Sequence, residues 1–151
     1  MSNPSTNIKD QLIGAWELVS YQVTDERGII TYPLGEDATG MAIYQEDGFM
    51  SVQTMSQGRP AYAAGDLHAG PPNAMAAAAK GYLAYSGTFH VHEDEGRVDH
   101  HMKVSLNPNW LGDTQPRYVQ IEEDLLTIKS QPVFIQGREQ NTQIVWRRLS
   151  K

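Results

Sequence analysis

A histidine stands in an otherwise apolar row of side chains within RVDHHMKVSLNPNW, residues 97–110. Alternate positions of this segment place His100 together with four apolar residues, which are Val98, Met102, Val104 and Leu106. Alternation with a period of two predicts a strand with one buried face. A neutral imidazole on that face offers one hydrogen-bond donor and one acceptor, which suits proton transfer or the binding of a carbonyl group.

The other histidines raise the question of a metal. His90 and His92 precede His100, and this spacing superficially resembles the metal site of cupins. His90 and His92, however, share the polar face of their strand, whereas His100 lies on the opposite face, and no carboxylate follows at the required spacing. We therefore expect no metal and no other cofactor. Two roles remain open for His100: a structural histidine bonded to a buried carbonyl or hydroxyl, or an imidazole that faces a ligand in a cavity.

The register of the hairpin around residues 93–96 predicts the neighbour of His100 across the strand. If Tyr85 and Phe89 face the interior, a loop of two or four residues pairs residue 92 with residue 97. Phe89 then lies opposite His100. A loop of three residues would instead place His100 opposite the solvent-facing row, which contradicts the apolar pattern.

Arg117 also occupies an apolar row, since it alternates with Val119 and Ile121. A buried guanidinium must be paired or hydrogen-bonded. One alternative is a structural partner, either Asp113 or a backbone carbonyl near residues 107–116. The other alternative is a role as an anchor for an oxyanion or carboxylate of a ligand.

The separation of Arg117 from His100 depends on the connection between their strands. A tight turn would place Arg117 opposite Leu106, about six residues from His100, which is roughly 20 Å at about 3.3 Å per residue. The two side chains can then contact one ligand only if the segment 107–116 bulges inward.

Composition limits the class of protein. The chain has 151 residues and a formal net charge of −6, which favours one domain over residues 1–151 and argues against nucleic-acid binding. It has no cysteine, which excludes a disulfide framework and a thiolate metal site. No apolar run approaches the roughly 18 residues of a membrane span, and the polar start MSNPSTNIKD does not resemble a signal peptide. We expect a soluble cytoplasmic monomer or homodimer.

Short alternating segments separated by charged or glycine-containing turns predict an all-β barrel or sandwich. The ten predicted strands lie near residues 14–24, 28–33, 40–46, 49–56, 82–92, 97–106, 117–122, 125–130, 132–136 and 141–149. A short helix is expected within STNIKDQLIG, and an alanine-rich helix near 72–81. The segment 56–72 is too long for a hairpin, and we interpret it as a mobile cover over one opening.

Several of these segments resemble a known family. LIGAWELVSY (12–21) resembles the Gly-x-Trp opening of lipocalins, and IVWRRL (144–149) resembles their closing strand, whose arginine packs across that tryptophan. Three further segments are similar to the bacterial and fungal lipocalin-like domain family: GMAIYQEDGFMS (40–51), YLAYSGTF (82–89) and VDHHMKVSLNPNWLGDTQPRYV (98–119). The resemblance implies a single closed antiparallel up-and-down β-barrel of the calycin type, with eight to ten strands and an internal cavity. Some similar barrels in biosynthetic pathways act as cofactor-free cyclases or isomerases, so the resemblance also allows such an activity.

Strand parity gives a prediction about the two ends of the barrel. If ten strands run up and down, Trp16 and Arg148 lie at the same end, where they can form a cation–π contact of about 0.5–2 kcal/mol. Both helices are expected at this end too. The acidic turns at 25–28, 46–48, 93–96 and 122–124 are expected at the opposite rim. An acidic rim that forms the opening would disfavour anionic ligands.

Two functions from different classes fit these residues. The first is a barrel that binds a small, largely apolar organic molecule, and its expected ligand contacts are Tyr44, Phe89, Met102 and Trp16, although Trp16 can also be a structural plug. The second is a cofactor-independent isomerase or cyclase, in which His100 moves a proton and Tyr85 or Arg117 stabilises developing negative charge. Whether the protein is an enzyme is left open by the sequence.

Overall fold

The structure is a computed structural model that describes residues 7–150 apart from 64, 67, 69 and 136. Its strands are β1 (Gly14–Thr24), β2 (Ile30–Thr31), β3 (Thr39–Tyr44), β4 (Phe49–Met55), β5 (Tyr82–His92), β6 (Arg97–Ser105), β7 (Thr114–Glu122), β8 (Leu125–Ser130), β9 (Val133–Ile135) and β10 (Arg138–Ser150). Its helices are α1 (Ile8–Leu12), α2 (Pro72–Lys80) and two short 3₁₀ helices, Glu93–Glu95 and Pro108–Trp110.

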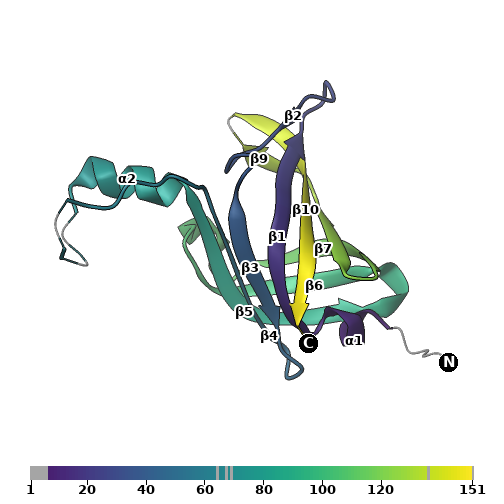
Figure 1. Cartoon of the computed structure of the whole chain (residues 1–151). Coiled ribbons are helices and arrows are strands. Elements are labelled where there is room, and N and C mark those ends of the chain that lie inside the picture. Colours follow the sequence, from purple (N-terminus) through teal and green to yellow (C-terminus); the bar gives the residue numbers. More distant parts are fainter. Residues whose placement is uncertain (1–6, 64, 67, 69, 136, 151) are drawn as a thin grey trace.

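The strands form one antiparallel sheet that closes on itself (Figure 1). The order is β2-β1-β3-β4-β5-β6-β7-β8-β10-β9, and β1 also pairs with β10 from Ala15 opposite Ser150 to Thr24 opposite Asn141. This last pairing makes a barrel of eight strands. The short strands β2 and β9 extend its rim, so the predicted all-β barrel is confirmed.

Trp16 and Arg148 lie together at one end of the barrel, which we call the closed end. They are partners in the β1–β10 register, and the Arg148 guanidinium lies 4.3 Å from the centre of the Trp16 ring. The Arg148 guanidinium also donates to the carbonyl oxygen of Gln11 at 2.7 Å, and the Trp16 indole donates to the carbonyl oxygen of Leu12 at 3.0 Å. The predicted contact is confirmed, and it ties α1 to the barrel floor.

Helix α1 is shorter than its sequence pattern. Asn7 caps it by accepting a hydrogen bond from the backbone of Asp10 at 2.8 Å, and residues 5 and 6 lie outside the described part of the chain. The carboxylate of Glu93 accepts hydrogen bonds from the backbone N–H groups of Ile8 and Lys9. The turn between β5 and β6 therefore lies beside α1, at the closed end.

The prediction that both helices share one end is wrong. β2 has only two residues and pairs only with the end of β1, so it does not cross the barrel wall. Three wall strands therefore separate α1 from α2, and an odd number places the two helices at opposite ends (Figure 1). For the same reason the acidic turns 46–48, 93–96 and 122–124 lie at the closed end, and only the turn 25–28 lies at the opposite, open end.

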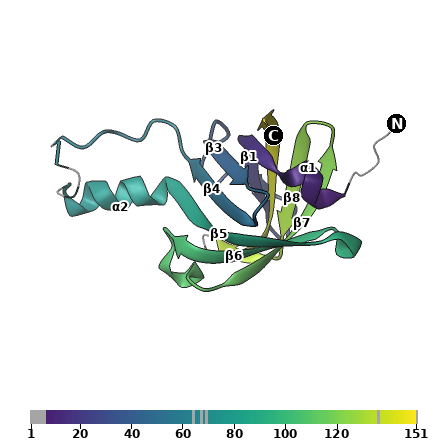
Figure 2. The same cartoon turned by 90° about the horizontal axis from the view of Figure 1, so that it is seen from below.

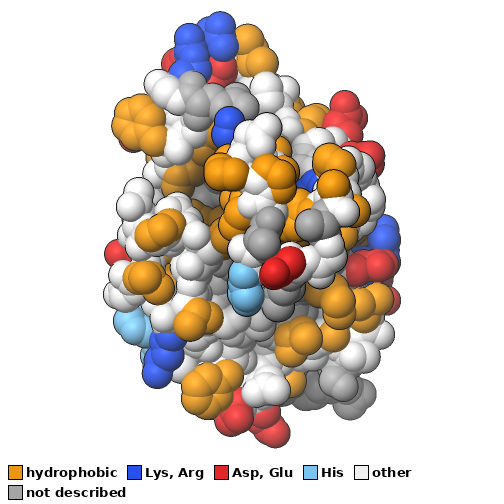
Figure 3. Space-filling model, turned by 90° about the vertical axis from the view of Figure 1, so that its left-hand side faces the viewer, with side chains coloured by type: hydrophobic (Ala, Val, Ile, Leu, Met, Phe, Trp, Pro, Cys, Tyr) orange, Lys and Arg blue, Asp and Glu red, His pale blue; other side chains and the backbone are white. Residues whose placement is uncertain are grey.

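The interpretation of residues 56–72 as a cover is also wrong. The described part of this segment and α2 extend sideways from the barrel (Figure 2), held at their base by the Arg59 guanidinium over the Tyr82 ring at 5.0 Å. On the side of the molecule from which α2 projects, the hydrophobic side chains form several separate groups (Figure 3). None of the described residues of this segment or of α2 lines the cavity described below.

The apolar row of β6 is interrupted by a bulge. The β5–β6 register shifts between Ser86 and Gly87, so that Val104 pairs with Ser86 and points outward with 60% of its surface exposed. A Cβ atom on Gly87 would lie 1.9 Å from the carbonyl oxygen of His101, which explains the glycine at this close approach. Val104 and Leu106, both expected inside, are therefore exposed.

No helix in the described part of the chain is long and apolar enough to cross a membrane.

Candidate ligand-binding site

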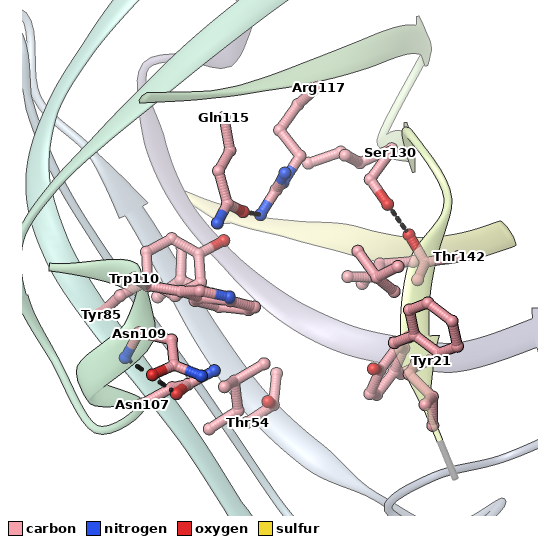
Figure 4. A pocket seen from close by; sticks show the side chains of 17 residues that line it. Tyr21, Thr54, Tyr85, Asn107, Asn109, Trp110, Gln115, Arg117, Ser130 and Thr142 are labelled. Carbon is pink, nitrogen blue, oxygen red and sulfur yellow. Dashed lines mark hydrogen bonds between the residues drawn. The ribbon is translucent and has the colours of Figure 1, made fainter. Parts of the chain in front are cut away.

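A cavity of about 440 Å³ occupies the open half of the barrel, away from Trp16 and Arg148 (Figure 4). Strands β1, β4, β5, β7, β8, β9 and β10 contribute to its wall, together with the turn 107–110. Its apolar surface comes mainly from aliphatic side chains, including Val52, Leu83, Ile128 and Ile144. This volume is within the range of about 300–1,000 Å³ that is usual for small-molecule sites.

Every polar side chain of the wall can donate a hydrogen bond, and two of them, Arg117 and Trp110, can only donate. The donors include the guanidinium of Arg117, the amide of Gln115, the indole of Trp110 and the hydroxyl of Tyr85. Figure 4 shows Gln115 and Arg117 on one side of the cavity and Thr54 across from them. Among the described residues, no aspartate or glutamate lines the cavity. The site therefore favours a ligand that presents acceptor oxygens.

Arg117 reaches the cavity because the β6–β7 connection is long. The pairing begins at His101 opposite Thr114, and it places Gln115 opposite His100 and Arg117 opposite Val98. The tight turn with Arg117 opposite Leu106 is thus wrong, and Arg117 lies much closer to His100 than that turn would allow.

Part of the segment 107–116 lies against the cavity, since Asn107, Asn109 and Trp110 line its wall, but His100 does not line it. Two backbone bonds hold the segment, from Met102 N–H to the carbonyl of Asp113 and from Gly112 N–H to the carbonyl of Met102, both at 2.9 Å. The 3₁₀ turn in this segment places Trp110 in the cavity wall, where its ring meets the Tyr85 ring edge to face at 5.8 Å.

Arg117 is buried, with 8% of its surface exposed, and its hydrogen bonds are to neutral acceptors. It donates to the side-chain oxygen of Gln115 at 2.7 Å and to the carbonyl of Pro116 at 3.4 Å. Of the two structural partners considered from the sequence, a backbone carbonyl is present and Asp113 is not among its hydrogen bonds. Because Arg117 bonds to the oxygen of the Gln115 amide, the N–H groups of this amide can donate to an acceptor in the cavity.

His100 lies in the core directly below the cavity, with 1% of its surface exposed and opposite Phe89 as predicted. Its Nε2 atom is 2.8 Å from the hydroxyl of Tyr44, and its Nδ1 atom is 3.3 Å from the hydroxyl of Tyr85. Of these three residues only Tyr85 lines the cavity. His100 is therefore connected to a ligand site through one hydrogen bond rather than by direct contact.

Burial keeps His100 and Tyr44 uncharged. Desolvation, with a smaller contribution from the charge of Arg117, lowers the pKa of His100 well below its ordinary value of 6.5. Desolvation also raises the pKa of Tyr44 well above 10.0. The imidazole is neutral at pH 7, so one ring nitrogen donates and the other accepts.

The direction of these hydrogen bonds follows from the surroundings of Tyr44. Among the described residues, His100 is the only acceptor within reach of the buried Tyr44 hydroxyl, so a satisfied Tyr44 proton points to Nε2. Nδ1 of His100 then carries the ring proton and donates to the oxygen of Tyr85. The O–H of Tyr85 is thereby free to donate into the cavity.

The remaining predicted site residues have other positions. Trp16, Phe89 and Met102 belong to the packed core below the cavity, as does Tyr44, whose ring meets that of Phe89 at 5.1 Å. His90 and His92 project from the outer face of β5, and His92 pairs with Asp99 at 3.0 Å. Of the predicted site residues, Tyr85 and Arg117 reach the cavity wall.

The sequence reasoning missed the other wall residues, including Tyr21, Thr54, Trp110 and Gln115. Gln115 shares the alternation of Arg117, so a strand started at residue 114 instead of 117 would have identified it. Trp110 is an aromatic residue within a polar turn, which was the available signal for insertion into the barrel.

Comparison with known proteins agrees with this geometry. A model of the lipocalin-like domain family matches residues 13–149. The chain belongs to this family. A similar protein is the 4'-hydroxy-3'-methoxypropiophenone carrier protein of Aspergillus oryzae, which is 37% identical over an alignment of 109 residues. The alignment covers 68% of this chain and 98% of the relative. The lipocalin-like barrel described above thus has a relative named as a carrier of a small aromatic ketone.

Proposed function

We propose that this lipocalin-like barrel binds and carries a small aromatic molecule that bears a ketone or phenol oxygen. The observation that carries the proposal is the composition of the cavity wall, in which aliphatic and aromatic surface surrounds donors and, among the described residues, no carboxylate. Apolar surface drives the ring out of water, and a few placed donors orient its oxygens.

The name of the Aspergillus oryzae relative supports this ligand class. The compound in that name has one aromatic ring, a ketone, a methoxy group and a phenolic hydroxyl. Each of its oxygens can accept a hydrogen bond from Tyr85, Trp110, Gln115 or Arg117. A single-ring compound of this kind is small enough for a cavity of about 440 Å³.

A cofactor-independent isomerase or cyclase is the second candidate, and the bond between His100 and Tyr85 favours it. In such a reaction Tyr85 would exchange the proton with the substrate, because His100 does not reach the cavity. Arg117 would stabilise the oxyanion that develops on the substrate. This function needs chemical turnover, whereas carriage needs only binding and release.

Calorimetric titration with two probes tests the proposal. The hydroxylated probe is 4'-hydroxy-3'-methoxypropiophenone, and the methylated probe is the same compound with the 4'-hydroxyl converted to a methoxy group. We expect Tyr85→Phe to weaken binding of the hydroxylated probe by roughly 0.5–1.5 kcal/mol, the usual value of one hydrogen bond. Tyr118→Phe, at an exposed tyrosine outside the cavity, is the matched control and should bind as the unchanged protein does.

Chromatography of the same mixtures after prolonged incubation separates the two candidate functions. Recovery of unchanged probe supports a carrier, and a rearranged product would support an isomerase or cyclase. If neither probe binds at millimolar concentration, the proposed ligand class is wrong.

A further inference from the structure

Arg117 differs from the other arginines of the chain in its charge environment. Five other arginines of the described chain each have a carboxylate oxygen within ion-pair distance: Arg27, Arg97, Arg138, Arg147 and Arg148. Arg59 is exposed and lies over the Tyr82 ring. Arg117 alone is both buried and without a carboxylate partner in the part of the chain that the structure describes.

The groups that face Arg117 across the barrel do not supply a negative charge. Among the described residues, the other ionisable side chains of the cavity wall are Tyr21 and Tyr85, and the charge of Arg117 also acts on the buried Tyr44 and His100. None of these four is a carboxylate. Burial raises the pKa of Tyr21 and Tyr44, so both keep their protons. Arg117 has hydrogen bonds but no opposite charge in this part of the chain to offset the cost of its desolvation.

The distribution of acidic residues also permits an anion at the open end. Three of the four acidic turns lie at the closed end. At the open end, Asp25 pairs with Arg27 at 2.6 Å, and Glu26 pairs with Arg138. Glu36, Asp37, Asp113 and Glu139 also lie at the open end, but none of them lines the cavity, so no carboxylate among the described residues of the wall opposes an anionic ligand.

We propose that the cavity binds its aromatic ligand as a phenolate, with Arg117 as the counter-charge. This inference rests on the proposed function and specifies the charge of the ligand that the cavity prefers. On binding, the phenol releases its proton to the solvent, and the resulting oxygen anion accepts hydrogen bonds from Arg117 and its neighbouring donors. Such charge-assisted bonds are roughly twice as strong as neutral ones.

A phenol with an acyl group opposite its hydroxyl suits this site. The acyl group withdraws electron density and makes the phenol more acidic, so that ionisation near neutral pH needs only a modest contribution from the protein. The anionic charge spreads over the ring to the ketone oxygen, which lets donors at separate positions in the wall share it. A methyl ether of the same size cannot ionise and therefore serves as the matched ligand control.

Absorption spectroscopy measures the charge of the bound probe directly, because a phenolate absorbs at longer wavelength than its phenol. We expect the hydroxylated probe to show the phenolate band when bound at a pH about one unit below its free pKa, which corresponds to a shift of at least about one pKa unit. If the neutral phenol and the ether bind alike, the hydroxylated probe should bind about twofold more tightly than the methylated probe at that pH, and about tenfold more tightly at a pH above its free pKa. Its affinity should fall as the pH is lowered, whereas that of the methylated probe should stay constant.

Arg117→Gln should remove the phenolate band and bring the two probes to similar affinities. Arg147→Gln removes an exposed arginine on the outer surface and should leave both properties unchanged. Arg117→Lys keeps the charge and should retain part of the shift. If Arg117→Gln fails to fold, the comparison of the two probes in the unchanged protein still decides the question.

The outcomes separate this inference from the proposed function. If both probes bind equally and the bound phenol keeps its neutral band, the protein binds aryl ketones but the phenolate proposal is overturned. The phenolate proposal is also overturned if an aromatic carboxylic acid of similar size binds more tightly than the hydroxylated probe and the bound hydroxylated probe stays neutral. If neither probe binds, the proposed function itself fails.

Discussion

The hydroxyl oxygen of Tyr85 lies 3.3 Å from Nδ1 of His100, so a residue of the cavity wall is bonded to a residue of the closed core. The second ring nitrogen of His100 is bonded to Tyr44 at 2.8 Å. Because the imidazole is neutral, this arrangement determines which way the Tyr85 hydroxyl points. Residues that do not contact the ligand can therefore change its binding.

We expect His100→Gln to weaken binding of the hydroxylated probe by about 1 kcal/mol, since an amide at this position does not hold the Tyr85 hydroxyl in one orientation. It should also lower the free energy of unfolding by about 1–3 kcal/mol, because a buried hydroxyl loses its partner. Calorimetric titration and urea unfolding measure the two effects. A variant that loses stability but keeps full affinity in the folded fraction would assign His100 a structural role only.

Tyr44→Phe tests the direction of the hydrogen bonds. The change removes the proton that points to Nε2, so His100 can adopt the other tautomer and accept from Tyr85. We expect the affinity for the hydroxylated probe to fall by up to about tenfold, although Tyr44 does not line the cavity. Tyr118→Phe, at an exposed tyrosine, is the control. Unchanged affinity in Tyr44→Phe would contradict the assigned direction.

The stability of the protein should fall as the pH decreases below about 6.5. Burial lowers the pKa of His100 in the folded state, so the unfolded chain binds the proton more readily in this range. The free energy of unfolding therefore decreases with falling pH by up to about 1 kcal/mol per pH unit and levels off above about pH 7. Urea unfolding at pH 5 to 8 measures the slope.

The contribution of His100 to this slope can be isolated by substitution. His100→Gln should flatten the dependence between pH 5 and 7, and His90→Gln, on the outer face, should not. An equal slope in the unchanged protein and in His100→Gln would assign the effect to other groups.

Arg148→Ala should lower the free energy of unfolding by about 1–3 kcal/mol, since it removes the contact with the Trp16 ring and the bond to the carbonyl of Gln11. Affinity for the hydroxylated probe should not change, because the closed end lies away from the cavity. Thermal unfolding and titration provide the two readouts. Arg147→Ala removes the neighbouring exposed arginine and should change stability by less than about 0.5 kcal/mol.

Ligand binding should survive both exhaustive chelation and the double change of His90 and His92 to glutamine. These side chains project from the outer face of β5, where their rings lie 4.7 Å apart and His92 is bonded to Asp99. Titration of the hydroxylated probe before and after chelation is the measurement. Binding that disappears on chelation and returns with one specific metal ion would refute this prediction.

The sequence by itself determined the local geometry of the barrel. Alternation along a strand follows from the covalent backbone, so it assigned His100 to the interior, His90 and His92 to the outer face and Phe89 to the position opposite His100. The contact between Trp16 and Arg148 was also predictable, because it needs only an even total number of wall strands. Both the ten strands expected and the eight observed satisfy that condition.

Tertiary structure decided which segments cross the wall and which interior residues face a cavity. Ile30 and Thr31 have a strand-like sequence, but a wall strand must pair with a neighbour on each side along the length of the barrel. These two residues pair only with the end of β1. The bulge at Gly87 turns Val104 outward, although alternation alone places it inside. Arg117 reaches the cavity through the non-local bonds that hold residues 106–113. The inward-facing residues of all strands have similar sequence patterns. Only the closed barrel shows that those around Trp16 pack against one another, whereas Tyr85 and Arg117 face an open cavity.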